Sequence, residues 1–140
     1  MIVLDTDHLG EFQKGRTAAA SQLRTRLEDS GDSVATTIVC VEELMRGWLA
    51  AIHKERAPSR QIRPYGRLHQ LFLFLADWTI LPWSESTAGI LAEFRREKIR
   101  VGTMDLKIAS IALDADALLL TRNLRDFDRV PGLHVEDWLS

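Results

Sequence analysis

The sequence is poor in the residues that build cysteine or histidine metal sites, and it has no excess of basic charge. Cys40 is the only cysteine, which excludes an internal disulfide framework and a cysteine zinc site. The four histidines show neither His-x3-His nor His-Glu-x-x-His spacing, so each is expected to be a surface or structural residue. The formal net charge is −2, so the chain lacks the overall basic field of many nucleic-acid-binding proteins. An enzyme acting on nucleic acid would then need bound cations or local arginine clusters.

Long hydrophobic runs are also missing. The longest, at 71–76, is far too short to span a membrane. The apolar run at 2–4 is too short for a signal peptide, so we expect a cytoplasmic protein without membrane contacts. The length of 140 residues and 46% hydrophobic content suit a single domain over residues 1–140 with its own core.

Short apolar runs alternate with amphipathic stretches along the chain. Strands are expected at 2–4, 33–37, 78–82 and 117–121, with a short edge strand near 133–138. Between them, helices are expected in two pieces up to residue 29, at 38–56, after Pro58, at 84–100, and at 101–117 with Thr103 as N-cap. Residues 122–132 are expected to form a turn. This alternation predicts a three-layer α/β/α sandwich with a central, mainly parallel sheet of four to five strands.

Acidic residues gather where these strands are expected to end. Asp5 follows the first strand, Glu42 and Glu43 begin the helix after the second, and Asp105 lies in the first turn of the helix before the fourth. Asn123 and Asp126 follow the fourth strand. The carboxyl ends of parallel strands meet at one edge, which is where such sheets carry their chemistry. Each acid alone also fits an ordinary helix start or surface, and periodicity does not decide between Glu42 and Glu43.

Converging carboxylates need protons or a cation. Two like charges about 4 Å apart repel by roughly 4 kcal/mol at an effective dielectric near 20. Oxygen ligands suit Mg²⁺ or Mn²⁺, and one or two such ions could activate water and stabilise charge at a phosphorus centre.

Two other functions are compatible with part of this pattern. Asp5 and Asp7 could be the nucleophile and acid/base of a haloacid-dehalogenase-type phosphatase, but the acid pair expected after a later strand is missing. The chain could also be a binding module without catalysis, although such a module would be expected to have lost acids that are present here.

Four stretches together resemble PIN-domain proteins, and most closely the VapC-type ribonuclease toxins of toxin–antitoxin modules. They are "IVLDTDHL", "TTIVCVEELMRG", "VGTMDLKIASIAL" and "LLLTRNLRDFDRVPGLHVEDW". They occur in the family's order and span the whole chain. The resemblance implies a Mg²⁺- or Mn²⁺-dependent endoribonuclease that hydrolyses RNA with metal-activated water, is inhibited by a cognate antitoxin and forms homodimers.

The resemblance also assigns roles residue by residue. Asp5, Glu43 and Asp105 match the first three acids of the family. Glu43 is assigned as the second acid because it directly precedes Leu44 and stands four residues before Gly47. Either Asn123 or Asp126 completes the set, and Asp126 is favoured as the fourth catalytic and metal-binding acid. Supporting positions are expected at Thr6, Thr121, Asn123 and Asp7.

Three further expectations follow from the same stretches. Asp7 stands where Asn is usual, and it could bind metal or cap the next helix, with capping favoured. Arg122 and Arg125 are candidates for RNA phosphate contacts. Residues 38–76 are expected to form a helical hairpin for dimer or antitoxin contacts, unless the apolar run 71–75 is fully buried. The RNA target does not follow from the sequence.

Overall fold

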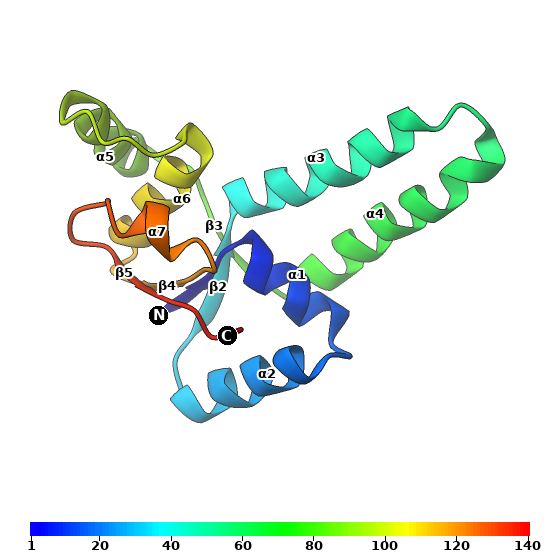
Figure 1. Ribbon diagram of the computed structural model, residues 1–140, viewed down its shortest axis with the longest axis horizontal. Helices are drawn as coiled ribbons and strands as arrows, with labels where there is room; N and C mark the ends of the chain where they lie inside the picture. Colours follow the sequence, from blue (N-terminus) through cyan, green and yellow to red (C-terminus); the bar gives the residue numbers. More distant parts are fainter.

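The computed structural model describes all 140 residues and contains one sheet of five parallel strands (Figure 1). The strands are β1 (Ile2–Leu4), β2 (Val34–Thr37), β3 (Thr79–Leu81), β4 (Leu118–Leu120) and β5 (His134–Glu136). They lie in the order β3-β2-β1-β4-β5, and every neighbouring pair is parallel. The predicted three-layer α/β class and strand number are therefore confirmed. Strand β1 lies between β2 and β4, so the acids that follow these strands can lie close together.

Seven α-helices surround the sheet. They are α1 (Thr6–Lys14), α2 (Ala18–Ser30), α3 (Ile38–Lys54), α4 (Ile62–Leu75), α5 (Glu85–Arg96), α6 (Thr103–Asp114) and α7 (Leu124–Phe127), with a 3₁₀ turn, η1, at Pro58–Gln61. The break between α1 and α2 has a clear local cause. Gly15 ends α1 with a left-handed φ of 66°, and the Thr17 hydroxyl accepts from the amide of Ala20 to begin α2.

Two local predictions are wrong. Thr103 is not the N-cap of α6: Gly102 occupies that position without a side-chain hydrogen bond, and Thr103 is the first helical residue. The segment 122–132 is not only a turn, because it contains the short helix α7. Phe127 at the end of α7 is completely buried, so tertiary packing supports a helix that is too short to show a periodic pattern.

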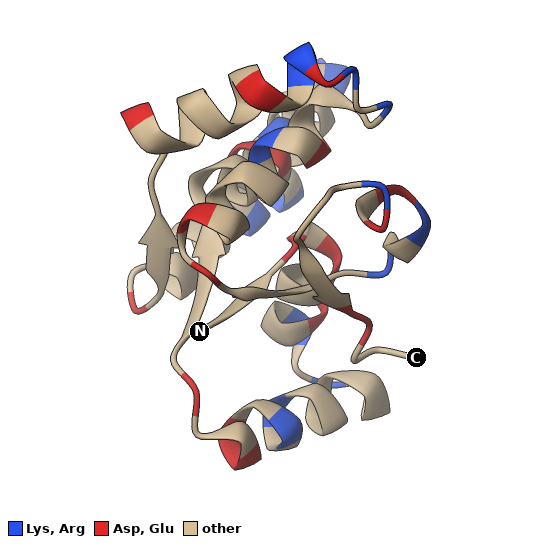
Figure 2. Ribbon diagram, turned by 90° about the vertical axis from the view of Figure 1, so that its left-hand side faces the viewer, with Lys and Arg blue, Asp and Glu red and all other residues tan.

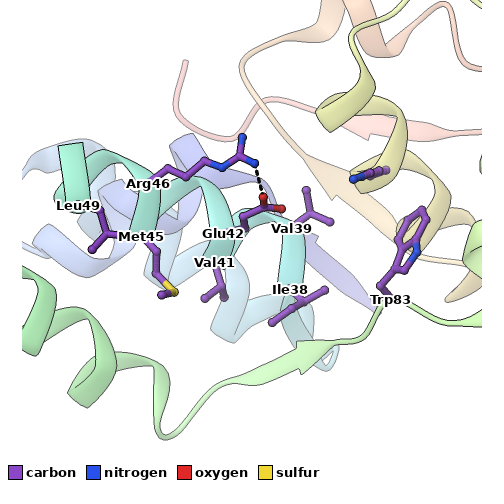
Figure 3. A pocket seen from close by; sticks show the side chains of 9 residues that line it. Ile38, Val39, Val41, Glu42, Met45, Arg46, Leu49 and Trp83 are labelled. Carbon is purple, nitrogen blue, oxygen red and sulfur yellow. Dashed lines mark ion pairs between the residues drawn. The ribbon is translucent and has the colours of Figure 1, made fainter.

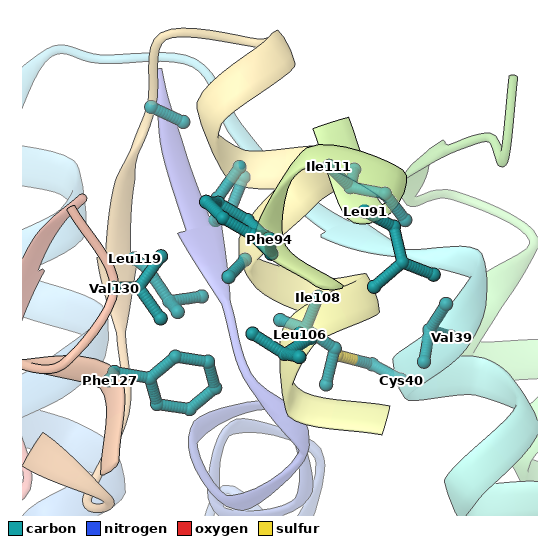
Figure 4. Packing of buried hydrophobic residues seen from close by; sticks show 14 residues of the cluster. Val39, Cys40, Leu91, Phe94, Leu106, Ile108, Ile111, Leu119, Phe127 and Val130 are labelled. Carbon is teal, nitrogen blue, oxygen red and sulfur yellow. The ribbon is translucent and has the colours of Figure 1, made fainter. Parts of the chain in front are cut away.

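The core lies on both faces of the sheet because the strand side chains alternate. Ile2 and Leu4 pack with α1, α2 and α4 in one cluster, whereas Val3 packs with α5, α6 and α7 in the other. Figure 4 shows the second cluster, in which Cys40 of α3 lies beside Leu106 of α6. This packing places the starts of α1, α3 and α6 near the carboxyl edge of the sheet.

Helices α3 and α4 form the hairpin expected at 38–76, and Figure 1 shows it projecting away from the sheet. On α4, Leu71 and Leu75 are buried, but Phe72 and Leu73 are 51% and 62% exposed. The alternative of a fully buried run at 71–75 is therefore wrong. No helix of the protein has the length and apolar character needed to cross a membrane.

Candidate metal centre

Asp5 lies at the centre of the acidic cluster, directly after the middle strand β1. Only 6% of it is exposed. Its Oδ1 accepts from the Thr6 amide at 2.7 Å, and its Oδ2 accepts from the Thr121 hydroxyl at 2.7 Å. The Cys40 thiol lies 3.7 Å from Oδ1. These neutral donors from three segments fix the carboxylate without neutralising its charge.

Glu43, and not Glu42, faces Asp5. Its Oε1 accepts from the Thr6 hydroxyl at 3.0 Å, so Thr6 joins the first and second acids through its amide and its hydroxyl. Glu42 instead pairs with Arg46 at 2.6 Å, and Figure 3 shows this pair in the open groove along α3. The geometry therefore selects the same glutamate as the motif Glu43-Leu44.

Asp105 and Asp126 are joined by Asn123. The Asn123 side-chain amide donates to Oδ2 of Asp105 and to Oδ2 of Asp126, both at 3.1 Å. The backbone amide of Asn123 donates to the Thr121 hydroxyl at 3.0 Å. Both members of the pair that the sequence left open are therefore in the cluster, with Asn123 as a neutral bridge between two acids.

The four acids repel one another. Burial raises the pKa of Asp5, and the charge of Asp7 raises it further. Burial also raises the pKa of Glu43 and of Asp105, and each feels the charge of Asp5. Asp126 adds to the upward shift of the Asp105 pKa. No Lys or Arg side chain forms an ion pair with any of these acids, so the cluster has excess negative charge that a cation would neutralise.

The donor set fits a hard divalent cation. Carboxylate oxygens of Asp5 and Glu43 lie within 4.8 Å of each other and of the Cys40 sulfur, and the Asp105–Asn123–Asp126 group adds further oxygens. Carboxylate oxygens are the ligands that Mg²⁺ and Mn²⁺ prefer. The sequence did not place Cys40 at the site. Its spacing could have done so, because Cys40 stands three residues before Glu43 and therefore lies on the same face of α3. Burial raises the pKa of this thiol to about 12, so it is a protonated donor beside Asp5.

The prediction that Asp7 caps α1 is wrong. Asp5 is the N-cap residue, and Asp7 lies inside the first turn. Asp7 Oδ1 accepts from the His8 amide and lies 2.6 Å from His8 Nδ1, while Oδ2 accepts from the Arg122 amide at 2.9 Å. Although burial raises the pKa of Asp7, the donors on His8 and Arg122 lower it more. Asp7 therefore anchors the loop after β4.

His8 continues this connection to the end of the chain. Its ring is completely buried, and its Nε2 accepts from the Trp138 amide at 3.1 Å. His8 is thus a structural histidine, as expected. The side chains of Arg122 and Arg125 are exposed and form no ion pair. They belong to the same loop and short helix as Asn123 and Asp126, at the rim of the cluster.

The family model of the PIN domain matches residues 2–133. The chain belongs to the PIN domain family. Ribonuclease VapC2 of Rickettsia felis is 29% identical over 111 residues, which cover 76% of this chain and 75% of the relative. The tRNA(fMet)-specific endonuclease VapC of Salmonella typhimurium is 42% identical over 52 residues, but this match covers only 37% of the chain and 39% of the relative. The resemblance found in the sequence is therefore confirmed.

Solved structures of other proteins share this fold. VapBC2 from Rickettsia felis, bound to a DNA fragment from their promoter, matches with a TM-score of 0.72 and 23% identity over 99% of both chains. VapBC-1 from nontypeable Haemophilus influenzae matches with a TM-score of 0.72 and 22% identity over the whole of both chains. The arrangement of strands and helices thus persists at low sequence identity.

Proposed function

We propose that this PIN domain is a Mg²⁺- or Mn²⁺-dependent endoribonuclease that acts as the toxin of a toxin–antitoxin module. One observation carries the proposal: four acids converge at the carboxyl edge of the sheet, held by neutral donors and compensated by no cationic side chain. The similarity to VapC ribonucleases of Rickettsia felis and Haemophilus influenzae supports the choice of RNA as substrate.

Asp5, Glu43, Asp105 and Asp126 would hold one or two ions. A bound divalent cation activates water and stabilises the charge that develops at the phosphorus during hydrolysis of a phosphodiester bond. Thr121 and Thr6 orient Asp5 and Glu43 through their hydroxyls. Asn123 keeps Asp105 and Asp126 together.

The rim of the site supplies the cationic side chains. Arg122 and Arg125 are exposed next to Asn123 and Asp126, and neither is paired to an acid. They would contact the phosphates on either side of the scissile bond and so hold the strand across the acids.

The geometry disfavours a haloacid-dehalogenase-type phosphatase. That reaction needs Asp7 to serve as acid/base toward a phosphorylated Asp5. Both oxygens of Asp7 instead accept from His8 and Arg122, and both oxygens of Asp5 accept from the neighbouring donors.

Protein partners would bind the base of the hairpin. An apolar groove of about 490 Å³ runs along α3, and its lining includes the exposed Ile38 and Leu49 of α3 and the exposed Trp83 between β3 and α5 (Figure 3). Phe72 and Leu73 on α4 add further exposed apolar area. Exposed apolar patches of this kind mark protein contacts, which supports binding of an antitoxin and of a second copy.

The test uses protein purified free of antitoxin. We expect cleavage of RNA in Mg²⁺ or Mn²⁺, no cleavage in EDTA, and no cleavage by Asp5→Asn in either ion. An acyl-phosphate trapped on Asp5 during turnover of a phosphate ester would instead support the phosphatase. RNA cleavage that survives both EDTA and Asp5→Asn would refute the proposal.

A further inference from the structure

Basic charge is concentrated at the outer end of the hairpin. Residues 54–67 contain five of the chain's 18 Lys and Arg residues but only one of its 20 acids. We call this segment the basic corner; its cations are Lys54, Arg56, Arg60, Arg63 and Arg67. The rest of the chain is therefore more acidic than the net charge of −2 suggests.

The cations of the basic corner are exposed and unpaired. All five side chains are exposed, and none takes part in any ion pair of the protein. On other parts of the surface, positively and negatively charged side chains lie next to each other. Figure 2 shows Lys and Arg beside Asp and Glu along α5 and around α7, and Arg96 pairs with Glu93. The basic corner therefore differs from an ordinary charged surface, on which cations have acidic neighbours.

The corner also has a defined shape. The side-chain amide of Gln61 donates to the carbonyls of Ile52 and Glu55, at 3.3 and 2.9 Å, and this ties η1 to the end of α3. Pro64, Leu71 and Leu75 form the buried face of α4. A rigid support reduces the entropy lost when a ligand binds.

Positions on α4 place two of the cations together. Arg63 and Arg67 are four residues apart, so they lie on one side of the helix. Arginine forks match phosphate oxygens. This pair therefore suits the phosphate backbone of an RNA chain.

The same charge argues against a second copy of this chain at the corner. A two-fold interface brings the same patch of both copies together, and two sets of unpaired cations would repel each other. The apolar groove and the exposed Phe72 and Leu73 lie toward the base of the hairpin, so protein contacts there leave the corner free.

The corner lies outside the metal centre but is connected to it by α3. Glu43 is in the first turns of α3 and Lys54 is its last residue, which separates them by about 17 Å along the helix axis. A single strand of only two or three nucleotides at the acids would not reach both surfaces, and a longer single strand would lose conformational entropy in bridging them. A folded RNA stem is stiff and has phosphates on its outside, so it would reach both without that loss.

We propose that the basic corner is a second RNA-binding surface, which holds the folded body of the substrate while one of its strands lies at the acids. This inference rests on the proposed function and adds a binding surface to it. Cleavage then depends on the corner only for folded substrates. Phosphate contacts at the corner raise affinity without taking part in the reaction.

The test separates binding from cleavage. A labelled RNA stem-loop is titrated with protein in EDTA over a range of salt, comparing wild type with the double variant Arg60→Gln/Arg63→Gln. Two lost phosphate contacts should lower the slope of log affinity against log salt by about 1.4 to 1.8, and weaken binding at low salt about tenfold. The matched control is Lys14→Gln/Arg16→Gln at the end of α1, which removes the same charge from exposed positions and should leave slope and affinity unchanged.

Cleavage is then measured with the stem-loop and with a short unstructured oligonucleotide. For the corner variant, KM for the stem-loop should be about tenfold higher with kcat unchanged, and cleavage of the short strand should be unaffected.

Equal binding by the corner variant and wild type would overturn the inference even if wild type cleaves RNA. Equal loss in the corner and control variants would also overturn it, because the effect would then be one of net charge. Corner-dependent binding without any cleavage would support the surface and refute the nuclease. A change in self-association of the corner variant, with RNA binding intact, would assign the corner to a protein partner and overturn the inference.

Discussion

Oδ1 of Asp7 lies 2.6 Å from Nδ1 of the fully buried His8 ring, and Nε2 of that ring accepts the amide of Trp138. A backbone amide can only donate, so Nε2 must be unprotonated and the ring proton of neutral His8 must sit on Nδ1. Asp7 thus sets the tautomer that holds the C-terminal segment, while its second oxygen accepts from Arg122. An asparagine has only one oxygen and cannot accept on both sides.

The substitution Asp7→Asn should therefore destabilise the fold by about 1 kcal/mol, because the single oxygen of asparagine can accept on only one side and one of the two hydrogen bonds is lost. Urea unfolding monitored by tryptophan fluorescence measures the change. Asp29→Asn, on the exposed surface of α2, is the control and should be neutral. Equal stability of Asp7→Asn and wild type would show that the two-sided contact has no energetic value.

Thr121→Val removes the hydroxyl that donates to Oδ2 of Asp5 while keeping the side-chain size. Loss of a partner that orients a metal ligand typically costs about 10- to 100-fold in affinity or activity. We expect a loss in this range in Mn²⁺ affinity, measured by calorimetry in the absence of RNA. The exposed Thr25→Val on α2 is the control. Unchanged Mn²⁺ affinity of Thr121→Val would mean that Thr121 does not orient the site.

Asp105→Asn should stabilise the metal-free protein. The pKa of Asp105 is raised by burial and by the charges of Asp5 and Asp126, and an asparagine can still accept from Asn123. Relief of repulsion at this half-buried position is worth on the order of 1 kcal/mol after screening by solvent. Thermal unfolding in EDTA should show a higher Tm for the variant, and Asp114→Asn at the exposed end of α6 should show no change. Added Mn²⁺ should raise the Tm of wild type more than that of Asp105→Asn.

The contribution of Asp5, Glu43 and Asp105 to stability should decrease as pH rises through their titration range. Burial and neighbouring charges raise the pKa values of Asp5, Glu43 and Asp105 in the folded protein above the ordinary values of these carboxyl groups. The folded state therefore binds more protons than the unfolded state, so the contribution of these groups to stability falls as pH rises from the ordinary pKa values through the raised ones. In EDTA, wild type should lose more stability than Asp105→Asn across this window. Parallel curves for the two proteins would contradict the repulsion.

Much of the site was predictable from the sequence, but the connections between its members were not. The alternation of strands and helices placed Asp5, Glu43 and Asp105 at one edge, because parallel strands end together. Periodicity alone did not choose between Glu42 and Glu43; the motif chose Glu43, and the structure shows the reason, since Glu42 pairs with Arg46. The role of Asp7 depends on Arg122 and, through His8, on Trp138, which lie more than 100 positions away. No local pattern encodes such contacts. Helix α7 was missed for the same reason, because the burial of Phe127 stabilises it.

The central claim is that four acids, and not their acidic neighbours, form a metal-dependent ribonuclease site. The most direct measurement is the rate of RNA cleavage across a Mn²⁺ titration for Asp5→Asn, Glu43→Gln, Asp105→Asn and Asp126→Asn, with Glu42→Gln as the matched control. We predict that each of the four lowers kcat/KM by about 100-fold or more, equivalent to about 3 kcal/mol of transition-state stabilisation, and that Glu42→Gln stays close to wild type. Equal losses for Glu42→Gln and Glu43→Gln, or full activity of Asp5→Asn at any Mn²⁺ concentration, would contradict the account.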